Sequence, residues 1–277
     1  MRVIVENSSE AACIRAAQWI ARLVRKKPNC VLGLATGGTP VRTYAELSRM
    51  HREEELDFSR VTTFNLDEYV GLPPTHPQSY RYFMQEHLFQ HLNLRRDQTH
   101  VPDGRALDFE QYCQRYEQMI VDAGGIDLQL LGIGSDGHIA FNEPGSSLGS
   151  RTRLKTLTGD TIRDNARFFG GEQHVPRLAV TMGVGTILDA RQCLLLATGA
   201  SKSESVRAAI EGPVSAQITA SALQLHRDVI VILDEEAAGQ LARRDYYEEV
   251  EQAQRLLEEG RFAELGIVET SSGSGSD

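Results

Sequence analysis

The sequence predicts an α/β protein, a doubly wound and mostly parallel sheet flanked by helices in a Rossmann-like three-layer sandwich. Short apolar runs rich in Val, Ile and Leu recur along the 277 residues, and several are apolar on both faces, which suits strands covered by helices on each side. Amphipathic segments separate these runs, so strand and helix alternate through most of the chain. Because no repeat or composition break divides the sequence, we expect a single domain over residues 1–268 with right-handed crossovers.

Each apolar run is expected to form one strand. Short runs of three to six residues that are rich in Val, Ile and Leu are typical of strands in such a sheet. The six candidates cover residues 3–5, 30–34, 61–65, 128–133, 193–197 and 229–233.

Helices are expected where apolar residues recur at a spacing of three or four. Residues 10–27 carry such a stripe, and so do residues 109–120, which follow a plausible N-cap at Asp108. Another helix should begin at Pro40, because Thr39 is a good N-cap and proline suits the first helical position. The apolar stripes are most simply read as faces that pack on the core.

Composition limits the classes of function and of partner. The formal net charge is -9, whereas a protein that binds nucleic acid or a membrane surface needs a basic face. The four cysteines lie far apart, without the paired spacing of zinc sites, and are expected to be reduced core residues. No signal peptide or membrane span is evident, so we expect a cytoplasmic protein. Residues 269–277, rich in Ser and Gly, are expected to form a disordered tail.

The segment 132–144 is a candidate acid/base site. It places His138 between Asp136 and Glu143 in a glycine-rich turn that directly follows an apolar run. Histidine titrates nearest to neutral pH, and a flanking carboxylate would orient its ring. A simpler interpretation is a turn in which Asp136 caps local amides and His138 is a surface residue. The density of glycines and titratable groups favours the functional interpretation.

Two turns could hold an anion such as phosphate. The turn at residues 36–40 should present the free amides of a helix start, where anions bind. It is not a Walker loop, since no lysine follows the glycines, and an ordinary strand-to-helix turn is the alternative. A comparable turn at residues 198–202 offers Lys202 as a cation. Two such turns at one sheet edge suggest a single phosphate held from two sides.

Asp67 and Glu68 follow the third expected strand. Adjacent carboxylates at such a position are often a solvated helix start, which remains the alternative. However, Asp67, Thr36 and His138 all leave strand ends that one sheet edge can bring together. A carboxylate, an imidazole and a phosphate turn in one place would make a proton-transfer site for a sugar phosphate.

Several segments resemble glucosamine-6-phosphate deaminases closely, and in the same order. The similarity extends from about residue 31 to residue 234. The related 6-phosphogluconolactonases share the Gly-x-Gly-x-Asp-Gly-His turn but not the continuation from Ile139 to Pro144. The segments that carry the resemblance are residues 36–40, 64–69, 132–144, 150–157 and 183–186.

The resemblance implies a reaction and the residues that perform it. Glucosamine 6-phosphate and water would give fructose 6-phosphate and ammonia, with no cofactor or metal, as a step of amino-sugar catabolism. By resemblance, Asp67 is the base, His138 opens the sugar ring, and Asp136 and Glu143 are the carboxylate partners of His138. The implied phosphate clamp consists of Thr36, Gly37, Gly38, Thr39, Arg167 and Lys202. Arg167 lies in a segment, about residues 156–175, that resembles the mobile lid of the family.

The resemblance also implies regulation. Allosteric members bind N-acetylglucosamine 6-phosphate between the subunits of a homohexamer, through positions that match Ser146, Ser147, Arg153 and Lys155 here. Exposed basic pairs are usually solvated charges, which is the alternative for Arg153 and Lys155. The family's C-terminal aromatic residue at this site has only the adjacent pair at residues 246–247 as a counterpart.

Two other classes of function remain open. One is a sister enzyme on the same fold, either a 6-phosphogluconolactonase or an isomerase of another amino-sugar phosphate, and release of ammonia would separate these. The other is a non-catalytic sugar-phosphate sensor. Such regulators usually carry a DNA-binding domain, and the retention of Asp67 and His138 argues against a sensor.

Overall fold

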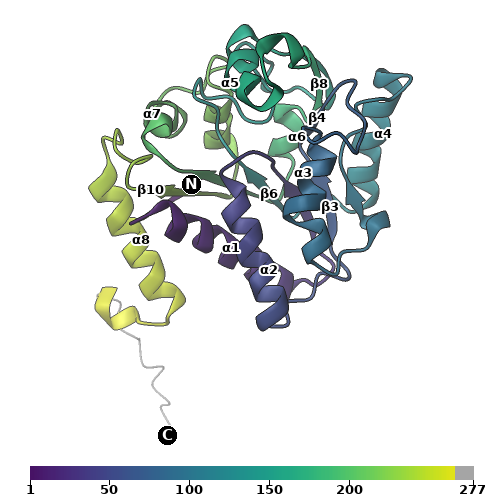
Figure 1. The fold of residues 1–277 in the computed structure, drawn as a ribbon. Helices are drawn as coiled ribbons and strands as arrows, with labels where there is room; N and C mark the ends of the chain where they lie inside the picture. Colours follow the sequence, from purple (N-terminus) through teal and green to yellow (C-terminus); the bar gives the residue numbers. More distant parts are fainter. Residues whose placement is uncertain (266–277) are drawn as a thin grey trace, which may run out of the picture.

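The computed structural model of the chain describes residues 1–265, apart from the side chains of residues 262 and 263. Within this range a seven-stranded sheet, all of whose neighbouring strands pair in parallel, forms the middle layer of the fold (Figure 1). The predicted fold class is therefore confirmed. In sheet order the strands are β1 (Arg2–Glu6), β10 (Val229–Asp234), β9 (Gln192–Ala197), β6 (Leu128–Leu131), β2 (Val31–Leu34), β3 (Thr62–Asn65) and β5 (Thr99–His100).

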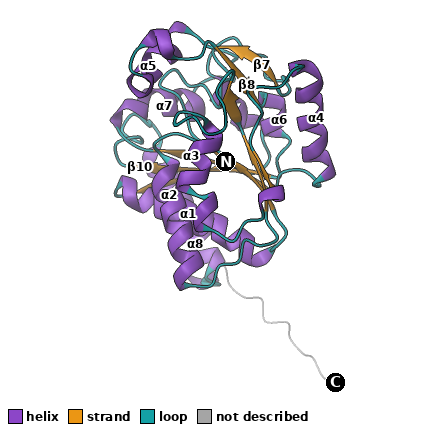
Figure 2. Cartoon of the chain, turned by 45° about the vertical axis from the view of Figure 1, so that its right-hand side comes forward, coloured by secondary structure: helices purple, strands orange, loops and turns teal. Residues whose placement is uncertain are grey.

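Helices cover both faces of this sheet. On one side lie α1 (Ser9–Lys26), α2 (Pro40–Glu53), α3 (Tyr80–His87) and α8 (Arg244–Glu258) (Figures 1 and 2). On the other side lie α4 (Phe109–Asp122), α6 (Val184–Leu188) and α7 (Ser203–Glu211). The strand order reverses beside β2, and crevices at such points are where open α/β sheets bind ligands.

The six predicted strands are all present, and the predicted helices begin close to the expected residues. The side chain of Asp108 accepts a hydrogen bond from the amide of Gln111, as an N-cap should. The predicted cap at Thr39 is wrong. Thr39 already has helical backbone angles and its side chain makes no capping hydrogen bond, although Pro40 does begin α2.

A second, three-stranded antiparallel sheet was not predicted. It consists of β4 (Asp67–Tyr69), β8 (Leu178–Thr181) and β7 (Arg153–Thr156), with β8 in the middle. The segment α5 (Gly159–Phe169) and a turn of 3₁₀-helix, η3 (Glu172–His174), adjoin it. A small apolar cluster joins these elements: Tyr69, Phe141, Leu157, Ile162, Val175 and Ala179.

Short 3₁₀ segments complete the described chain. They are η1 (Phe89–His91), η2 (Arg96–Gln98), η4 (Ala200–Lys202), η5 (Thr219–Leu225) and η6 (Phe262–Leu265).

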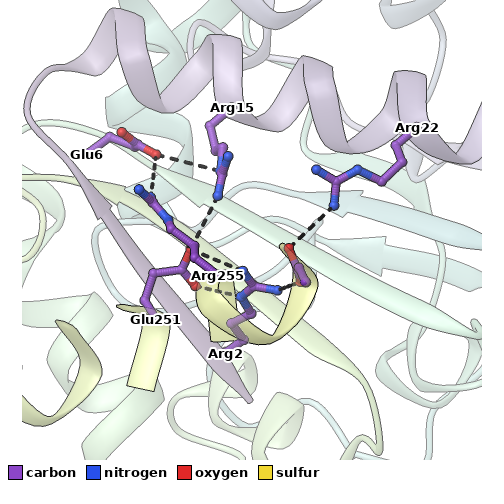
Figure 3. Close-up of polar contacts among 7 residues, drawn as sticks. Arg2, Glu6, Arg15, Arg22, Glu251 and Arg255 are labelled. Carbon is purple, nitrogen blue, oxygen red and sulfur yellow. Dashed lines mark hydrogen bonds and ion pairs between the residues drawn. The ribbon is translucent and has the colours of Figure 1, made fainter. Parts of the chain in front are cut away.

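An ion-pair network fastens α8 to the start of the chain (Figure 3). The carboxylate of Glu251 pairs with Arg2 of β1 at 2.6 Å, with Arg15 of α1 at 3.2 Å and with Arg255 of α8 at 2.8 Å. Glu251 is buried, so its charge depends on these partners. The network holds the last helix against the first strand.

The four cysteines are buried and free, as predicted. Within the described residues, no helix combines the length and the apolar character that crossing a bilayer requires. The predicted tail at residues 269–277 lies outside the described residues.

Candidate active site

Loops from the carboxyl ends of β2, β3, β6 and β9 meet around one cavity of about 270 Å³. The structure brings together here the turn at residues 36–40, Asp67, His138, Arg167 and Lys202. Side chains without a predicted role also line the cavity: Tyr80, Ser135, Phe141, Thr161, Asp164, Asn165 and Phe168. This is the edge of a parallel sheet at which ligands bind.

Asp67 is buried at the first position of β4, with 6% of its surface exposed. Burial, and secondly the charge of Glu68, raise the pKa of Asp67 to about 8. No hydrogen bond to its carboxylate occurs within residues 1–265 to offset this. The solvated helix start, which was the alternative for this position, is therefore wrong. A carboxylate with a pKa near neutrality is suited to general-base catalysis.

Glu68 has a different environment from its neighbour. Its carboxylate accepts hydrogen bonds from the backbone amides of Tyr69, Tyr80 and Arg81 and from the hydroxyl of Ser79, at 2.8–3.0 Å. These bonds tie β4 to the start of α3. Glu68 therefore fixes the position of Tyr80, whose ring packs on Tyr69 with centroids 5.0 Å apart.

Glycines make room for the imidazole of His138. A Cβ at Gly134 would lie 2.4 Å from ring atoms of His138, so only glycine allows the ring to lie against this backbone. Gly137 has a φ of +85°, a conformation that favours glycine. The glycines of the motif thus serve the placement of the histidine.

Two carboxylates face one nitrogen of His138. Its Nδ1 lies 2.6 Å from Oδ1 of Asp136 and 3.8 Å from Oε2 of Glu143, although neither contact has the alignment of a good hydrogen bond. Burial alone would raise the pKa of Asp136, but the close approach and charge of the His138 ring, with a hydrogen bond from the His138 backbone amide, lower it overall. Glu143 is buried, and its other oxygen accepts a hydrogen bond from the amide of Thr158 at 3.1 Å. Because Nδ1 faces these two carboxylates, Nε2 is the nitrogen left to act on a ligand.

The same three side chains are the group within residues 1–265 that could hold a metal ion, since one ligand atom of each lies within 4.8 Å of the others. Two ligands of a zinc ion, each about 2.0–2.2 Å from it, usually lie roughly 3 Å or more apart. The separation of 2.6 Å between His138 and Asp136 is shorter. The pair is therefore too close to serve as two ligands of one zinc ion in this arrangement.

The start of α2 is built to receive an anion. Because Thr39 does not cap the helix, the first amides of α2 remain available to a ligand at the positive end of the helix. Lys202 lines the same cavity, and burial lowers its pKa while the charges of Asp164 and Asp136 act in the opposite direction. The guanidinium of Arg167 lies over the ring of Phe168, 4.7 Å from its centroid, at the cavity wall.

The residues with a predicted regulatory role lie on one side of the molecule. Arg153 and Lys155 occupy alternate positions of β7, which places them on the same face of the strand. Ser147 is exposed, whereas Ser146 is buried and its hydroxyl has no hydrogen-bond partner within the described residues. The aromatic pair at residues 246–247 belongs to α8, which lies away from β7 in both views (Figures 1 and 2).

Arg153 has a contact that sequence reasoning missed. Its Nη1 donates a 2.9 Å hydrogen bond to Oδ1 of Asn142, the residue before Glu143. Asn142 is fully buried, and its side-chain nitrogen Nδ2 donates hydrogen bonds to the backbone carbonyls of Ile139 and Met182. A side chain on β7 thus holds the loop that carries the catalytic candidates. In the sequence, the sign of this contact was the presence of Asn142 within the motif at residues 132–144.

Comparison with known proteins shows similarity over most of the chain. Residues 5–232 match a family described as glucosamine-6-phosphate isomerases/6-phosphogluconolactonase. A glucosamine-6-phosphate deaminase of Hahella chejuensis is 52% identical over 262 residues, which is 95% of this chain and 100% of the relative. One from Arthrobacter is 53% identical over 247 residues, which is 89% of this chain and 95% of the relative.

Solved structures agree with this similarity. A structure described as a monomeric glucosamine-6-phosphate deaminase superposes with a TM-score of 0.85 at 47% identity, covering 87% of this chain and 100% of its own. A 6-phosphogluconolactonase from Trypanosoma cruzi gives a TM-score of 0.69 at 23% identity, covering 87% of this chain and 97% of its own. The second likeness concerns the fold alone.

Proposed function

The chain belongs to the family of glucosamine-6-phosphate isomerases and 6-phosphogluconolactonases, and from this premise we propose that it is a glucosamine-6-phosphate deaminase. The reaction converts glucosamine 6-phosphate and water into fructose 6-phosphate and ammonia. It requires ring opening, transfer of a proton from C2 to C1, and hydrolysis of the resulting imine.

His138 opens the ring in this proposal. The closed pyranose must receive a proton at the ring oxygen and lose one from the anomeric hydroxyl. An imidazole can do both, and because Asp136 and Glu143 lie on the Nδ1 side of the ring, Nε2 is the nitrogen that acts on the sugar.

Asp67 then transfers the proton between the two carbons. Its carboxylate removes the proton from C2 of the open-chain aldose and returns it to C1. A second proton passes from the amino group to the oxygen on C1, and the product is the imine of the ketose. Water adds to the imine carbon at C2, the carbon–nitrogen bond breaks, and ammonia leaves. A buried base with a pKa near 8 is well matched to this proton transfer at neutral pH.

The phosphate group of the substrate is held at the start of α2 by the amides of residues 36–39, with Lys202 and Arg167 as counter-charges. Arg167 belongs to α5, within the segment 156–175 that we propose moves as a lid. Closure of a lid would exclude water and complete the site.

One observation carries the proposal: a single cavity contains a buried carboxylate of raised pKa, an imidazole flanked by two carboxylates, and an uncapped helix start. The direct test is a coupled assay for ammonia with glucosamine 6-phosphate, in the presence of EDTA because we propose that no metal or cofactor takes part. A lactonase or a sensor would release no ammonia. Loss of activity in EDTA, restored by a divalent ion, would contradict the metal-free mechanism.

We place the enzyme in the cytoplasm and in amino-sugar catabolism, since the product is a hexose phosphate freed of its nitrogen. We also propose a homohexamer activated by N-acetylglucosamine 6-phosphate, bound through Ser146, Ser147, Arg153 and Lys155. The buried, unpaired hydroxyl of Ser146 among the described residues supports this site. Because one similar protein is described as monomeric, sedimentation velocity is the deciding measurement. A monomer would remove the proposed site between subunits.

A further inference from the structure

A second cavity, of about 320 Å³, lies between α3, β5 and α4. It shares no lining residue with the candidate active site within residues 1–265. Its lining includes the apolar side chains of Leu72, Val101 and Met119 and the basic side chains of Arg81 and Arg96. A cavity of this size can hold a small metabolite.

Two guanidinium groups line this cavity without a carboxylate partner. Nη1 of Arg81 donates to the backbone carbonyl of Thr99 at 2.8 Å, and neither Arg81 nor Arg96 forms an ion pair within the described residues. Burial, and secondly the charge of Arg96, lower the pKa of Arg81, so the two cations are close enough to repel each other. In a chain with a net charge of -9, such a pair is unusual and calls for an anion.

Two acidic residues, Glu68 and Asp103, line the cavity, and within the described residues neither forms an ion pair with Arg81 or Arg96. Oδ1 of Asp103 accepts a hydrogen bond from the amide of Arg105 at 2.8 Å. All four hydrogen bonds that the carboxylate of Glu68 accepts come from other groups, namely three backbone amides and the hydroxyl of Ser79. The hydroxyl of Tyr112 accepts a hydrogen bond from the backbone amide of Asp103 at 2.8 Å. The proton of this hydroxyl remains available to an oxygen of a ligand in the cavity. The cavity thus offers an anion two guanidinium groups and one phenol proton.

We propose that this cavity binds the phosphate group of a small phosphate ester, with Arg81 and Arg96 on the phosphate oxygens and the carbon chain against the apolar lining residues. The site is independent of the proposed reaction. It lies directly behind the candidate active site, however, because Asp67 and Tyr80 line one cavity while their neighbours Glu68 and Arg81 line the other. A ligand on Arg81 would contact the same helix start that holds Tyr80.

Equilibrium dialysis of the full chain with radiolabelled inorganic phosphate tests this site. Arg96→Gln should weaken one class of phosphate binding by about tenfold or more, the effect expected for a lost charge-assisted hydrogen bond. Arg95→Gln is the matched control, because Arg95 is adjacent, carries the same charge and is paired with Asp97 at 2.7 Å outside the cavity. It should leave phosphate binding unchanged. Arg96→Lys, which keeps the charge but loses the planar fork, should give an intermediate loss.

Equal effects of Arg96→Gln and Arg95→Gln would overturn the proposal, because they would show only the long-range effect of charge. Unlabelled glycerol 3-phosphate should displace the label from the Arg96-dependent site. Failure to displace it would overturn the assignment of an ester. Since Arg96 is exposed, thermal melting curves of all the variants should coincide with that of the parent protein.

Discussion

Asp67 and Glu68 are adjacent in β4, yet their carboxylates differ in hydrogen bonding. The carboxylate of Glu68 accepts four hydrogen bonds, whereas within the described residues that of Asp67 accepts none. Asp67 is therefore kept close to its neutral form by burial and by the charge beside it. The pair therefore gives Asp67 a pKa close to neutral pH, and the consequences for rate and stability can be measured.

Asp67→Asn should inactivate the protein and stabilise it at the same time. Removal of the general base should lower ammonia release and exchange of the C2 proton with solvent by about 10²-fold or more. Because burial raises the pKa of Asp67 above its value of 3.8 in the unfolded chain, the folded state loses stability as the pH rises from about 4 to about 8. At pH 8 the free energy of unfolding of the variant should thus exceed that of the parent by about 1–3 kcal/mol, and the variant should melt at a higher temperature. Near pH 4 the difference should vanish. Normal proton exchange in the variant would assign the base elsewhere.

The rate should follow the protonation of Asp67. For the free enzyme, kcat/KM should fall about tenfold for each pH unit below the pKa of about 8, since only the carboxylate form accepts a proton. Glu68→Gln should move this limb of the profile to lower pH, because it removes the charge that helps to raise the pKa of Asp67. The titration of the substrate's amino group is the same for both proteins. If this limb does not move, burial alone raises the pKa of Asp67 and the charge of Glu68 has no part in it.

His138→Gln should separate ring opening from proton transfer. An analogue of the substrate that lacks the hydroxyls of C4 and C5 can close neither a pyranose nor a furanose, so it bypasses the step assigned to His138. Relative to the parent protein, the variant should lose about 10²-fold or more on the natural substrate and much less on the analogue. Equal losses on both compounds would place His138 in a later step.

Glu251→Gln should weaken the attachment of α8. Burial alone would raise the pKa of Glu251, but hydrogen bonds from Arg2 and Arg255 lower it overall. Its ion pairs therefore stabilise the fold above about pH 4.5 and are lost as the pH falls through the lowered pKa. Near pH 7 the variant should lose about 1–3 kcal/mol of unfolding free energy. Glu249→Gln, an exposed change on the same helix, should have no measurable effect, and urea titrations at pH 7 and pH 4 compare the three proteins.

Arg153→Ala should abolish activation by the proposed effector. In the parent protein, N-acetylglucosamine 6-phosphate should lower the substrate concentration that gives half the maximal rate, because an effector acts through differential binding to two states. The variant should lose this shift, and any fall in its maximal rate should be smaller, reflecting the lost hydrogen bond to Asn142. Arg177→Ala, an exposed change beside the end of β7, where the Arg177 carbonyl accepts a hydrogen bond from the amide of Leu157, should respond to the effector normally. Hyperbolic, effector-independent kinetics in a parent hexamer would leave Arg153 with its structural role alone.

The parallel sheet could be predicted because each of its longer strands is apolar on both faces, a pattern that local sequence carries. The small sheet could not. The segment Asp67–Tyr69 is polar and only three residues long, and it becomes a buried strand because β8, more than a hundred residues later, pairs with it. Its burial is also what raises the pKa of Asp67, so the chemistry of this residue follows from a long-range contact.

Rules based on local sequence also failed where the surrounding structure decides which contacts a side chain makes. Thr39 has the composition of an N-cap, but its backbone is helical and its hydroxyl does not cap. Arg153 could be read as an exposed charge or an effector ligand, whereas its contact with Asn142 depends on how β7 lies against the loop after β6. The regular motifs were visible in the sequence, and the contacts between them were not.

The position of β1 has a consequence for synthesis on the ribosome. This edge strand, Arg2–Glu6, pairs with β10 alone within the described chain, and its Arg2 is held by α8. β1 therefore has no pairing partner until β10, the last strand of the described chain, has been synthesised. Contacts between such distant segments form slowly, so the nascent chain carries an unpaired strand until β10 has emerged. The edge of the sheet can be completed only after that point.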